Sequence, residues 1–139
     1  MKLFSLSFIF VSVLATNVYA QEAAVAPPVV KLPVQAPNVA AQKFGNDGKV
    51  NPGFASSHDR FVKIAQEGTA ELVFLGDSIT AGWGSKKEIW NTAFGQYKPA
   101  NFGIGGDRTQ HVLWRITNGE LEGTKPKAVV LMIGTNNLG

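Results

Sequence analysis

The sequence contains no cysteine, and its charged residues are few and scattered. Without cysteine, the chain excludes disulfide scaffolds, cysteine nucleophiles and thiolate metal sites. Thirteen Lys and Arg residues against ten Asp and Glu residues leave a formal net charge of only +3, and Lys86-Lys87 is the one adjacent basic pair. A protein that binds nucleic acid usually carries a basic stripe, so the dispersed charge predicts no nucleic-acid partner.

The sequence also lacks an apolar run of the ~20 residues that a membrane-spanning helix needs. A shorter run extends from Leu3 to Ala15, after the basic start Met1-Lys2. Val18-Tyr19-Ala20 follows it, with small residues at the two positions that define a cleavage site. This order is typical of a secretory signal peptide. It predicts a signal peptide over 1–20, a secreted or periplasmic protein, and no stable membrane span after cleavage.

Between 21 and 42 the composition changes. Fifteen of these 22 residues are Ala, Val or Pro, and four of the chain's seven prolines lie here. Spaced prolines interrupt the hydrogen bonding of helices and of central strands. We therefore expect an extended, polyproline-like linker over 21–42, which tethers a domain that begins at 43.

From 43 onward, segments with the apolar spacing of helices alternate with short apolar runs. The predicted strands cover 72–75, 100–102 and 128–133. The predicted helices begin at Ser56, at the Ser85/Glu88 capping pair and at the Asp107/Gln110 pair, and they end near Gly68, Gly95 and Gly119. Strands and helices that alternate in this way predict right-handed crossovers and a parallel sheet in an α/β fold.

Each predicted strand leads into a loop of glycine and small polar residues: 76–78, 103–107 and 134–137. Ligands of open parallel sheets bind beyond the carboxyl ends of the strands, so these loops should meet at one edge. Such an edge suits acyl transfer, which needs a nucleophile at a sharp turn and donors for an oxyanion. Ser78 is the candidate nucleophile. The backbone N–H groups of Ser78 and Gly106 and the side-chain amide of Asn136 are the candidate donors.

Each of these residues also has a plainer interpretation. Ser78 alone could cap a helix, the glycines could make a tight turn, and Asn136 could satisfy a helix start. Asp77 is expected to hydrogen-bond loop amides rather than to act as an acid or base. The glycines of 103–106 could also bind a nucleotide or phosphate at a helix N-terminus.

Other loop chemistries fail on spacing. Arg108 stands where a dinucleotide fingerprint needs glycine, and the sequence has no Gly-Lys-Ser/Thr for a phosphate-binding loop. The nucleophile elbow of α/β-hydrolases has the sequence Gly-x-Ser-x-Gly, and Thr80 stands where its last glycine would be, which disfavours that fold. The two histidines, His58 and His111, are too isolated to suggest a metal cluster, so we expect no metal.

Three ordered blocks resemble the GDSL, or SGNH, hydrolases: Gly76 to Thr80, Asn101 to Asp107, and Gly134 to Asn137. The stretch from Asn101 to Leu121 particularly resembles the catalytic subunits of intracellular platelet-activating-factor acetylhydrolase and their bacterial relatives. A Gly-Asp-Ser sequence by itself is a weak signal, whereas three blocks in order are specific. The resemblance covers about half of the chain.

The resemblance implies a flavodoxin-like three-layer α/β/α sandwich around a parallel sheet, and a serine esterase that needs no cofactor. It implies Ser78 as the nucleophile, with an oxyanion hole made by the Ser78 N–H, the Gly106 N–H and the Asn136 side chain. Gly106 is preferred to Gly103 and Gly105 because the family's donor is the last glycine before Asp. The implied substrate is a small acyl ester, such as an acetyl ester, of a carbohydrate or lipid.

The family places its catalytic Asp and His near the C-terminus, as Asp-x-x-His, and the sequence reaches Gly139 without that motif. His111 is expected to be structural, and relatives do not use the segment of His58 for chemistry. We therefore expect 43–139 to be the N-terminal portion of a hydrolase domain, incomplete at its C-terminus. An inactive truncated product, or a non-catalytic binding module of the same fold, is the alternative.

The strand predicted over 128–133 is apolar enough for the interior of a sheet, covered by helices on both faces. Three strands by themselves would leave it with exposed apolar surface and an unpaired edge. The chain taken alone is therefore expected to fold poorly. Trp83, Trp90 and Trp114 are expected to be packing residues.

Overall fold

The computed structural model describes residues 31–32 and 34–138. The predicted signal peptide over 1–20 and the first part of the predicted linker lie outside these residues. The described chain folds around one sheet of three strands in the order β2-β1-β3. These strands are β1 Leu72–Gly76, β2 Pro99–Gly103 and β3 Ala128–Met132. Both pairings are parallel, which confirms the predicted α/β fold and its parallel sheet.

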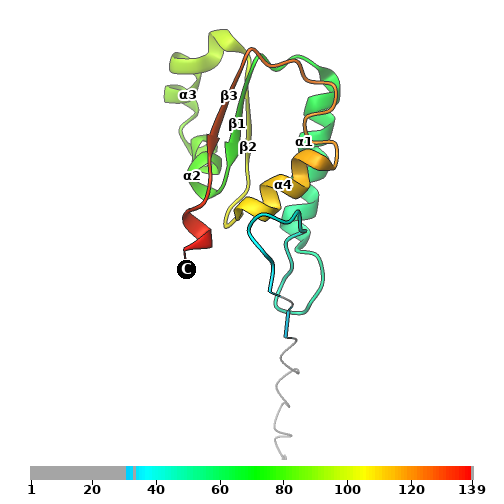
Figure 1. The fold of residues 1–139 in the computed structure, drawn as a ribbon. Helices are drawn as coiled ribbons and strands as arrows, with labels where there is room; N and C mark the ends of the chain where they lie inside the picture. The colour runs from blue at the N-terminus through cyan, green and yellow to red at the C-terminus, as the bar shows by residue number, and fades with distance from the viewer. Residues whose placement is uncertain (1–30, 33, 139) are drawn as a thin grey trace, which may run out of the picture.

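Helices cover both faces of this sheet (Figure 1). On one side lie α1 Pro52–Glu67 and α4 Thr109–Thr117, and on the other lie α2 Ser78–Ala81 and α3 Lys87–Phe94. The described residues also form three short 3-10 turns: η1 Gly82–Ser85, η2 Gly95–Tyr97 and η3 Thr135–Asn137. The three-layer α/β/α sandwich is therefore confirmed. None of the described helices has the length and apolar character needed to cross a membrane.

The first helix, α1, begins at Pro52 rather than at the predicted Ser56. The Asn51 side chain caps it by accepting a hydrogen bond from the Phe54 N–H at 3.0 Å. Proline suits the first turn because the N–H it lacks would have no partner within the helix. The predicted end is confirmed: Gly68 terminates α1 with a φ of 67°, a left-handed conformation that glycine adopts without steric cost.

The two other predicted capping pairs are wrong. The Ser85 hydroxyl donates to the Gly82 carbonyl at 2.8 Å, and α3 begins at Lys87. The Asp107 carboxylate does not cap α4, because it pairs with the buried Arg115 guanidinium at 3.0 Å. A helix cap is worth about 1 kcal/mol, whereas removing one partner of a buried ion pair costs about 3–5 kcal/mol. The ion pair therefore decides where this carboxylate lies.

The central strand, β1, is buried on both faces, as its apolar run predicts. On the side of α1, Leu75 packs with Phe61 and Phe102, whose rings stack with centroids 4.8 Å apart. On the opposite side, Phe74 contacts Trp90 with ring centroids 4.7 Å apart. The three tryptophans all pack against neighbouring aromatic rings, as expected for Trp83, Trp90 and Trp114.

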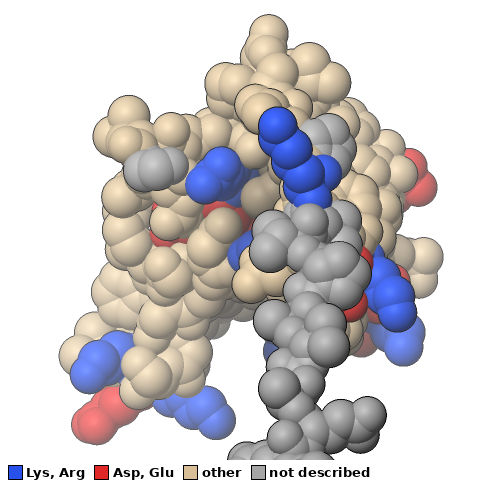
Figure 2. Space-filling view, turned by 90° about the horizontal axis from the view of Figure 1, so that it is seen from below, with Lys and Arg blue, Asp and Glu red and all other residues tan. Residues whose placement is uncertain are grey.

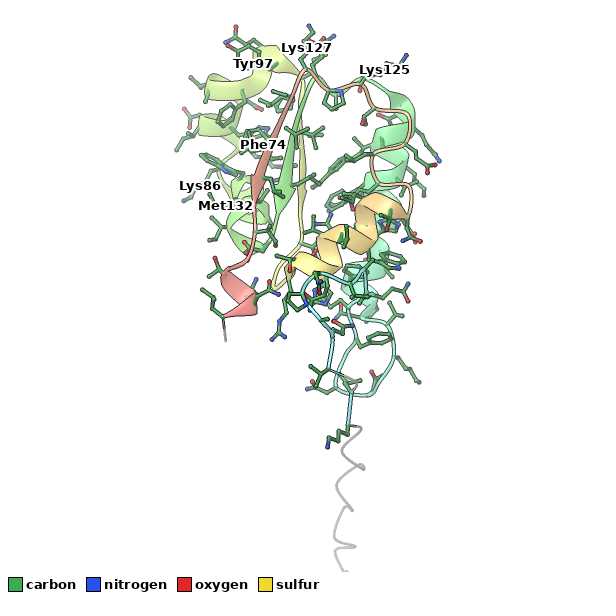
Figure 3. All side chains as sticks on the ribbon, in the orientation of Figure 1. Phe74, Lys86, Tyr97, Lys125, Lys127 and Met132 are labelled. Carbon is green, nitrogen blue, oxygen red and sulfur yellow. The ribbon has the colours of Figure 1, made fainter. Side chains whose placement is uncertain are left out.

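The third strand, β3, lies at one edge of the sheet and is exposed along its length. Leu131 is 59% exposed and Met132, labelled in Figure 3, is 50% exposed. Its apolar composition predicts an interior strand, but β3 pairs only with β1 among the described strands. This is the exposed apolar edge expected of three strands without further neighbours.

Part of the predicted linker is bound to the domain. The Pro37 carbonyl accepts a hydrogen bond from the Thr109 hydroxyl at 2.6 Å. Further along the same helix turn, His111 Nε2 lies 3.0 Å from Gln35 Oε1. This part of the segment therefore lies against the start of α4.

Candidate active site

The loops that follow β1, β2 and β3 meet at the carboxyl end of the sheet, which is its lower end in Figure 1. Pairing aligns the last residues of the three strands at one level. The Asn136 side chain then joins all three loops: its Nδ2 donates to the Asp107 carbonyl at 2.8 Å and to Asp77 Oδ2 at 3.3 Å. The predicted meeting of the three polar loops at one edge is confirmed.

In the first loop, Ser78 is the first residue of α2 and is exposed. Asp77 precedes it and is 1% exposed. Asp77 Oδ1 accepts a hydrogen bond from the Ile79 N–H at 2.9 Å and so caps the turn that carries the serine. This is a loop-amide hydrogen bond of the kind predicted for Asp77. A buried cap thus fixes a serine whose own side chain faces solvent.

The glycines of the second loop allow it to approach the first. A Cβ on Gly103 would lie 2.2 Å from the Ala81 backbone nitrogen, so only glycine fits where β2 passes α2. A Cβ on Gly105 would lie 4.0 Å from the Ser78 Cβ. Gly106, the next residue, has a φ of 70°. The exposed peptide between Gly105 and Gly106 therefore lies beside the serine.

The third loop is fixed to the start of α4. Asn137 Oδ1 accepts a hydrogen bond from the Thr109 N–H at 2.9 Å, and its Nδ2 donates to Gln110 Oε1 at 3.0 Å. Asn137 thus supplies to α4 the side-chain acceptor for which the sequence pattern favours Asp107. The same contacts hold the neighbouring Asn136 in place between the loops.

Beneath the loops lies a fully buried arginine that sequence reasoning missed. Arg115 donates from Nε to Asp107 Oδ2 at 3.0 Å and from Nη1 to the Phe102 carbonyl at 3.1 Å. Its Nη2 donates to the Gly76 carbonyl at 3.3 Å, and Nη1 also bonds Glu120. The guanidinium therefore ties the ends of β1 and β2 to the second loop.

A signal for Arg115 exists in the sequence. It stands within the apolar pattern of α4, between Val112 and Ile116, where a charged residue is out of place unless it has a buried partner. Glu120, five residues later, carries a carboxylate that can serve as such a partner. Spacing alone does not show which charged groups become buried, so the sequence pattern predicts no role for Arg115 or Glu120.

Burial dominates the electrostatics of this cluster. It raises the pKa of Asp107 to about 6, although the Arg115 and Lys43 cations act to lower it. Burial likewise raises the pKa of Glu120. Lys43 approaches from the segment before α1, with Nζ 3.7 Å from Asp107 Oδ1. Seen from this end of the molecule, basic side chains lie beside a partly covered acidic patch in a hollow (Figure 2).

Both histidines contact other residues of the fold. His111 Nδ1 accepts from the Arg108 N–H at 3.0 Å, which leaves the proton on Nε2 to donate to Gln35 Oε1. Burial lowers the pKa of His111 to about 4, as suits this neutral, structural role. His58 Nδ1 lies 3.5 Å from Glu120 Oε2. Within the described residues, no group of three His, Asp or Glu side chains is placed to hold a metal ion.

A family profile described as "GDSL-like Lipase/Acylhydrolase family" matches residues 74–139. Subunit alpha1 of platelet-activating factor acetylhydrolase IB from Bos taurus is 51% identical over 98 residues, and so is that from Homo sapiens. These matches cover 70% of this chain and 40% of each relative. Subunit alpha2 from Rattus norvegicus is 42% identical over 105 residues, 76% of this chain and 43% of the relative. The chain therefore spans about two fifths of the length of these relatives.

These relatives contradict the prediction of a secreted or periplasmic protein. They are subunits of platelet-activating factor acetylhydrolase IB, and the acetylhydrolase that the sequence resembles is intracellular. The predicted localisation is therefore wrong. It rests on the local composition of 1–20, which lies outside the residues that the structure describes.

The family match contains the whole candidate site. It begins in β1, includes the first and second loops, and continues past Asn136 in η3. The parallel sheet, the serine loop that follows β1 and the glycine loop that follows β2 have the order that the resemblance implies. On the family match, on these relatives and on its α/β fold, the chain belongs to the GDSL-like lipase/acylhydrolase family.

Proposed function

We propose that the complete protein containing this chain hydrolyses carboxylic esters through Ser78. The observation that carries the proposal is the exposed serine at the start of α2, beside the Gly105–Gly106 peptide. A nucleophile at a sharp turn next to free backbone donors is the arrangement that acyl transfer requires. Membership of an acylhydrolase family supports the same reaction class.

In the proposed reaction, Ser78 Oγ attacks the ester carbonyl carbon while its proton passes to a histidine. The tetrahedral intermediate collapses, the bond to the alcohol oxygen breaks, and the alcohol leaves with that proton. Water then attacks the acyl-enzyme, which releases the carboxylic acid and restores the serine. His58 and His111 are both held by other groups, so we expect the base and its Asp in an Asp-x-x-His motif downstream of this sequence. The 139-residue chain alone should therefore be inactive.

The oxyanion hole in this proposal consists of the Ser78 N–H, the Gly106 N–H and the Asn136 side chain. One Asn136 Nδ2 proton is committed to the Asp107 carbonyl at 2.8 Å, while the other makes a long contact of 3.3 Å with Asp77 Oδ2. An oxyanion on the intermediate competes well for that second proton, because the 3.3 Å contact with Asp77 is longer than an ordinary N–H···O hydrogen bond and is therefore weak. Each such donor is worth roughly 10²–10³ in kcat.

The proposed substrate is a small acyl ester of a carbohydrate or lipid, and no cofactor is needed. The names of the relatives, which are acetylhydrolase subunits, favour an acetyl group. A hollow of about 420 Å³ adjoins Gly106 and offers room for part of such an ester. Its lining includes Gln35, Lys43, Phe44, Arg108 and His111.

The test uses the complete protein with p-nitrophenyl acetate as substrate. Ser78→Ala should lower kcat/KM by roughly 10⁴–10⁶-fold, as loss of a triad member does. Ser85→Ala, at an exposed serine in the neighbouring turn, is the matched control and should leave turnover unchanged. A fluorophosphonate probe should label the parent and the control but not Ser78→Ala. Turnover that survives in Ser78→Ala would exclude the proposed mechanism, and a parent without turnover or labelling would favour a binding module.

A further inference from the structure

One lysine outside the three loops contacts the proposed oxyanion hole. Lys43 precedes α1, and its ammonium group donates to the Gly105 carbonyl. The same Nζ lies 3.7 Å from Asp107 Oδ1 and 3.1 Å from the point where a Cβ on Gly106 would lie. The Lys43 backbone is fixed as well, because its carbonyl accepts from the Asn51 N–H at 2.8 Å. A distant part of the sequence thus holds a cation against the second loop.

The Gly105 carbonyl and the Gly106 N–H belong to one peptide group. Because that group is planar and trans, its C=O and N–H point in opposite directions. A cation bonded to the oxygen therefore fixes the direction of the N–H and draws electron density away from it, which makes it a stronger donor. Among the described residues, no acceptor takes a hydrogen bond from this N–H.

We propose that Lys43 is a positioning residue of the active site: it holds the Gly105–Gly106 peptide so that the Gly106 N–H faces the oxyanion formed at Ser78. This inference rests on the proposed function and adds to it a residue outside the three family blocks. Glycines on both sides of a peptide leave its orientation weakly determined, so the loop by itself does not select one. The Lys43 hydrogen bond supplies that selection.

Asp107 keeps the lysine in place. Its side chain is 0% exposed, and the Lys43 side chain is 20% exposed. Asp107 Oδ1 is buried without a hydrogen-bond partner among the described residues, while Oδ2 is taken by Arg115. An unpartnered buried carboxylate oxygen attracts the nearest cation, and Lys43 Nζ is that cation at 3.7 Å. The ammonium is thus held between Asp107 and the Gly105 carbonyl.

The test compares Lys43→Met, Lys43→Arg and Lys49→Met in the complete protein. Lys43→Met should lower kcat about 10–100-fold and change KM less than about threefold, because the oxyanion exists only along the reaction path. Lys43→Arg keeps the cation and should recover most of kcat. Lys49→Met, at an exposed lysine of the same segment, should match the parent. In a ¹H–¹⁵N spectrum, the Gly106 amide proton should move upfield in Lys43→Met alone.

Three results would overturn the inference. One is a folded Lys43→Met with kcat within twofold of the parent. Another is an equal loss in Lys43→Arg with a lowered unfolding temperature, which would make Lys43 a structural anchor. If Lys43→Met does not fold, Lys43→Gln replaces it, and equal activity of the Gln and Arg variants is the third contrary result. Ser78→Ala, measured in parallel, separates the two proposals. If Ser78→Ala retains turnover, the proposed ester hydrolysis through Ser78 is wrong. If Ser78→Ala is inactive while Lys43→Met is unaffected, only the proposed role of Lys43 is wrong.

Discussion

Arg115 and Asp107 form an ion pair in the interior, with 3.0 Å between Nε and Oδ2 and both side chains 0% exposed. The same guanidinium donates to the carbonyls of Gly76 and Phe102, near the ends of β1 and β2. The Asp107 carbonyl in turn accepts from the Asn136 side chain. This one pair therefore connects the ends of β1 and β2 to the second loop and, through the Asp107 carbonyl, to the third.

Arg115→Met should destabilise the complete protein by about 3–5 kcal/mol, because it leaves Asp107 and Glu120 buried without their charged partner. Urea unfolding, followed by circular dichroism, measures the change. Lys87→Met, at an exposed position in α3, is the control and should change the free energy of unfolding by less than about 0.5 kcal/mol. A loss below about 1 kcal/mol in Arg115→Met would contradict the central role of the pair.

The pH dependence of stability should contain two opposed contributions. The pKa of Asp107 is raised from 3.8 to about 6, so this group takes up a proton on folding between those values. Its contribution to stability is therefore present at low pH and is lost as the pH rises to about 6. The pKa of His111 is lowered from 6.5 to about 4, so this group releases a proton on folding. Its contribution is present above about pH 6.5 and is lost as the pH falls.

Replacing either Asp107 or His111 should reveal the contribution of the other to the pH dependence of stability. Between pH 4 and 6.5, the free energy of unfolding of Asp107→Asn should rise with pH more steeply than that of the parent. His111→Gln should shift the slope in the opposite direction. Urea unfolding of the three proteins at a series of pH values gives the slopes, and groups common to all three cancel in the comparison. Variants that keep the parent's slope would show that neither pKa is shifted in the folded protein.

Gly103→Ala should destabilise the protein by about 1–3 kcal/mol and displace α2 with Ser78, because the new methyl group would lie 2.2 Å from the Ala81 backbone nitrogen. Gly84→Ala is the matched control, since a Cβ there meets no atom within 4 Å among the described residues. Unfolding temperature and esterase turnover are measured for both variants. If the two variants have equal unfolding temperatures and equal turnover, β2 and α2 can move apart without loss of stability, which would contradict this prediction.

The strands and the site loops were predictable because they depend on local patterns. Short apolar runs followed by glycine mark the three strands, and parallel pairing then brings their carboxyl ends to one edge. The helix caps were less predictable. Asn51 replaced Ser56 at the start of α1, and Asn137 replaced Asp107 as the side-chain acceptor at α4. Several residues near each end could serve as caps, and packing chose among them.

Periodicity and glycine placement were enough to identify the loops of the candidate site, since these patterns need no knowledge of distant residues. The partners of the charged groups, in contrast, depend on the tertiary structure. Lys43 and Gly105 are 62 residues apart, and Asn136 and Asp77 are 59 apart. Burial is the cause: a charged group withdrawn from water must find a partner in space, and the sequence does not show which groups are withdrawn together.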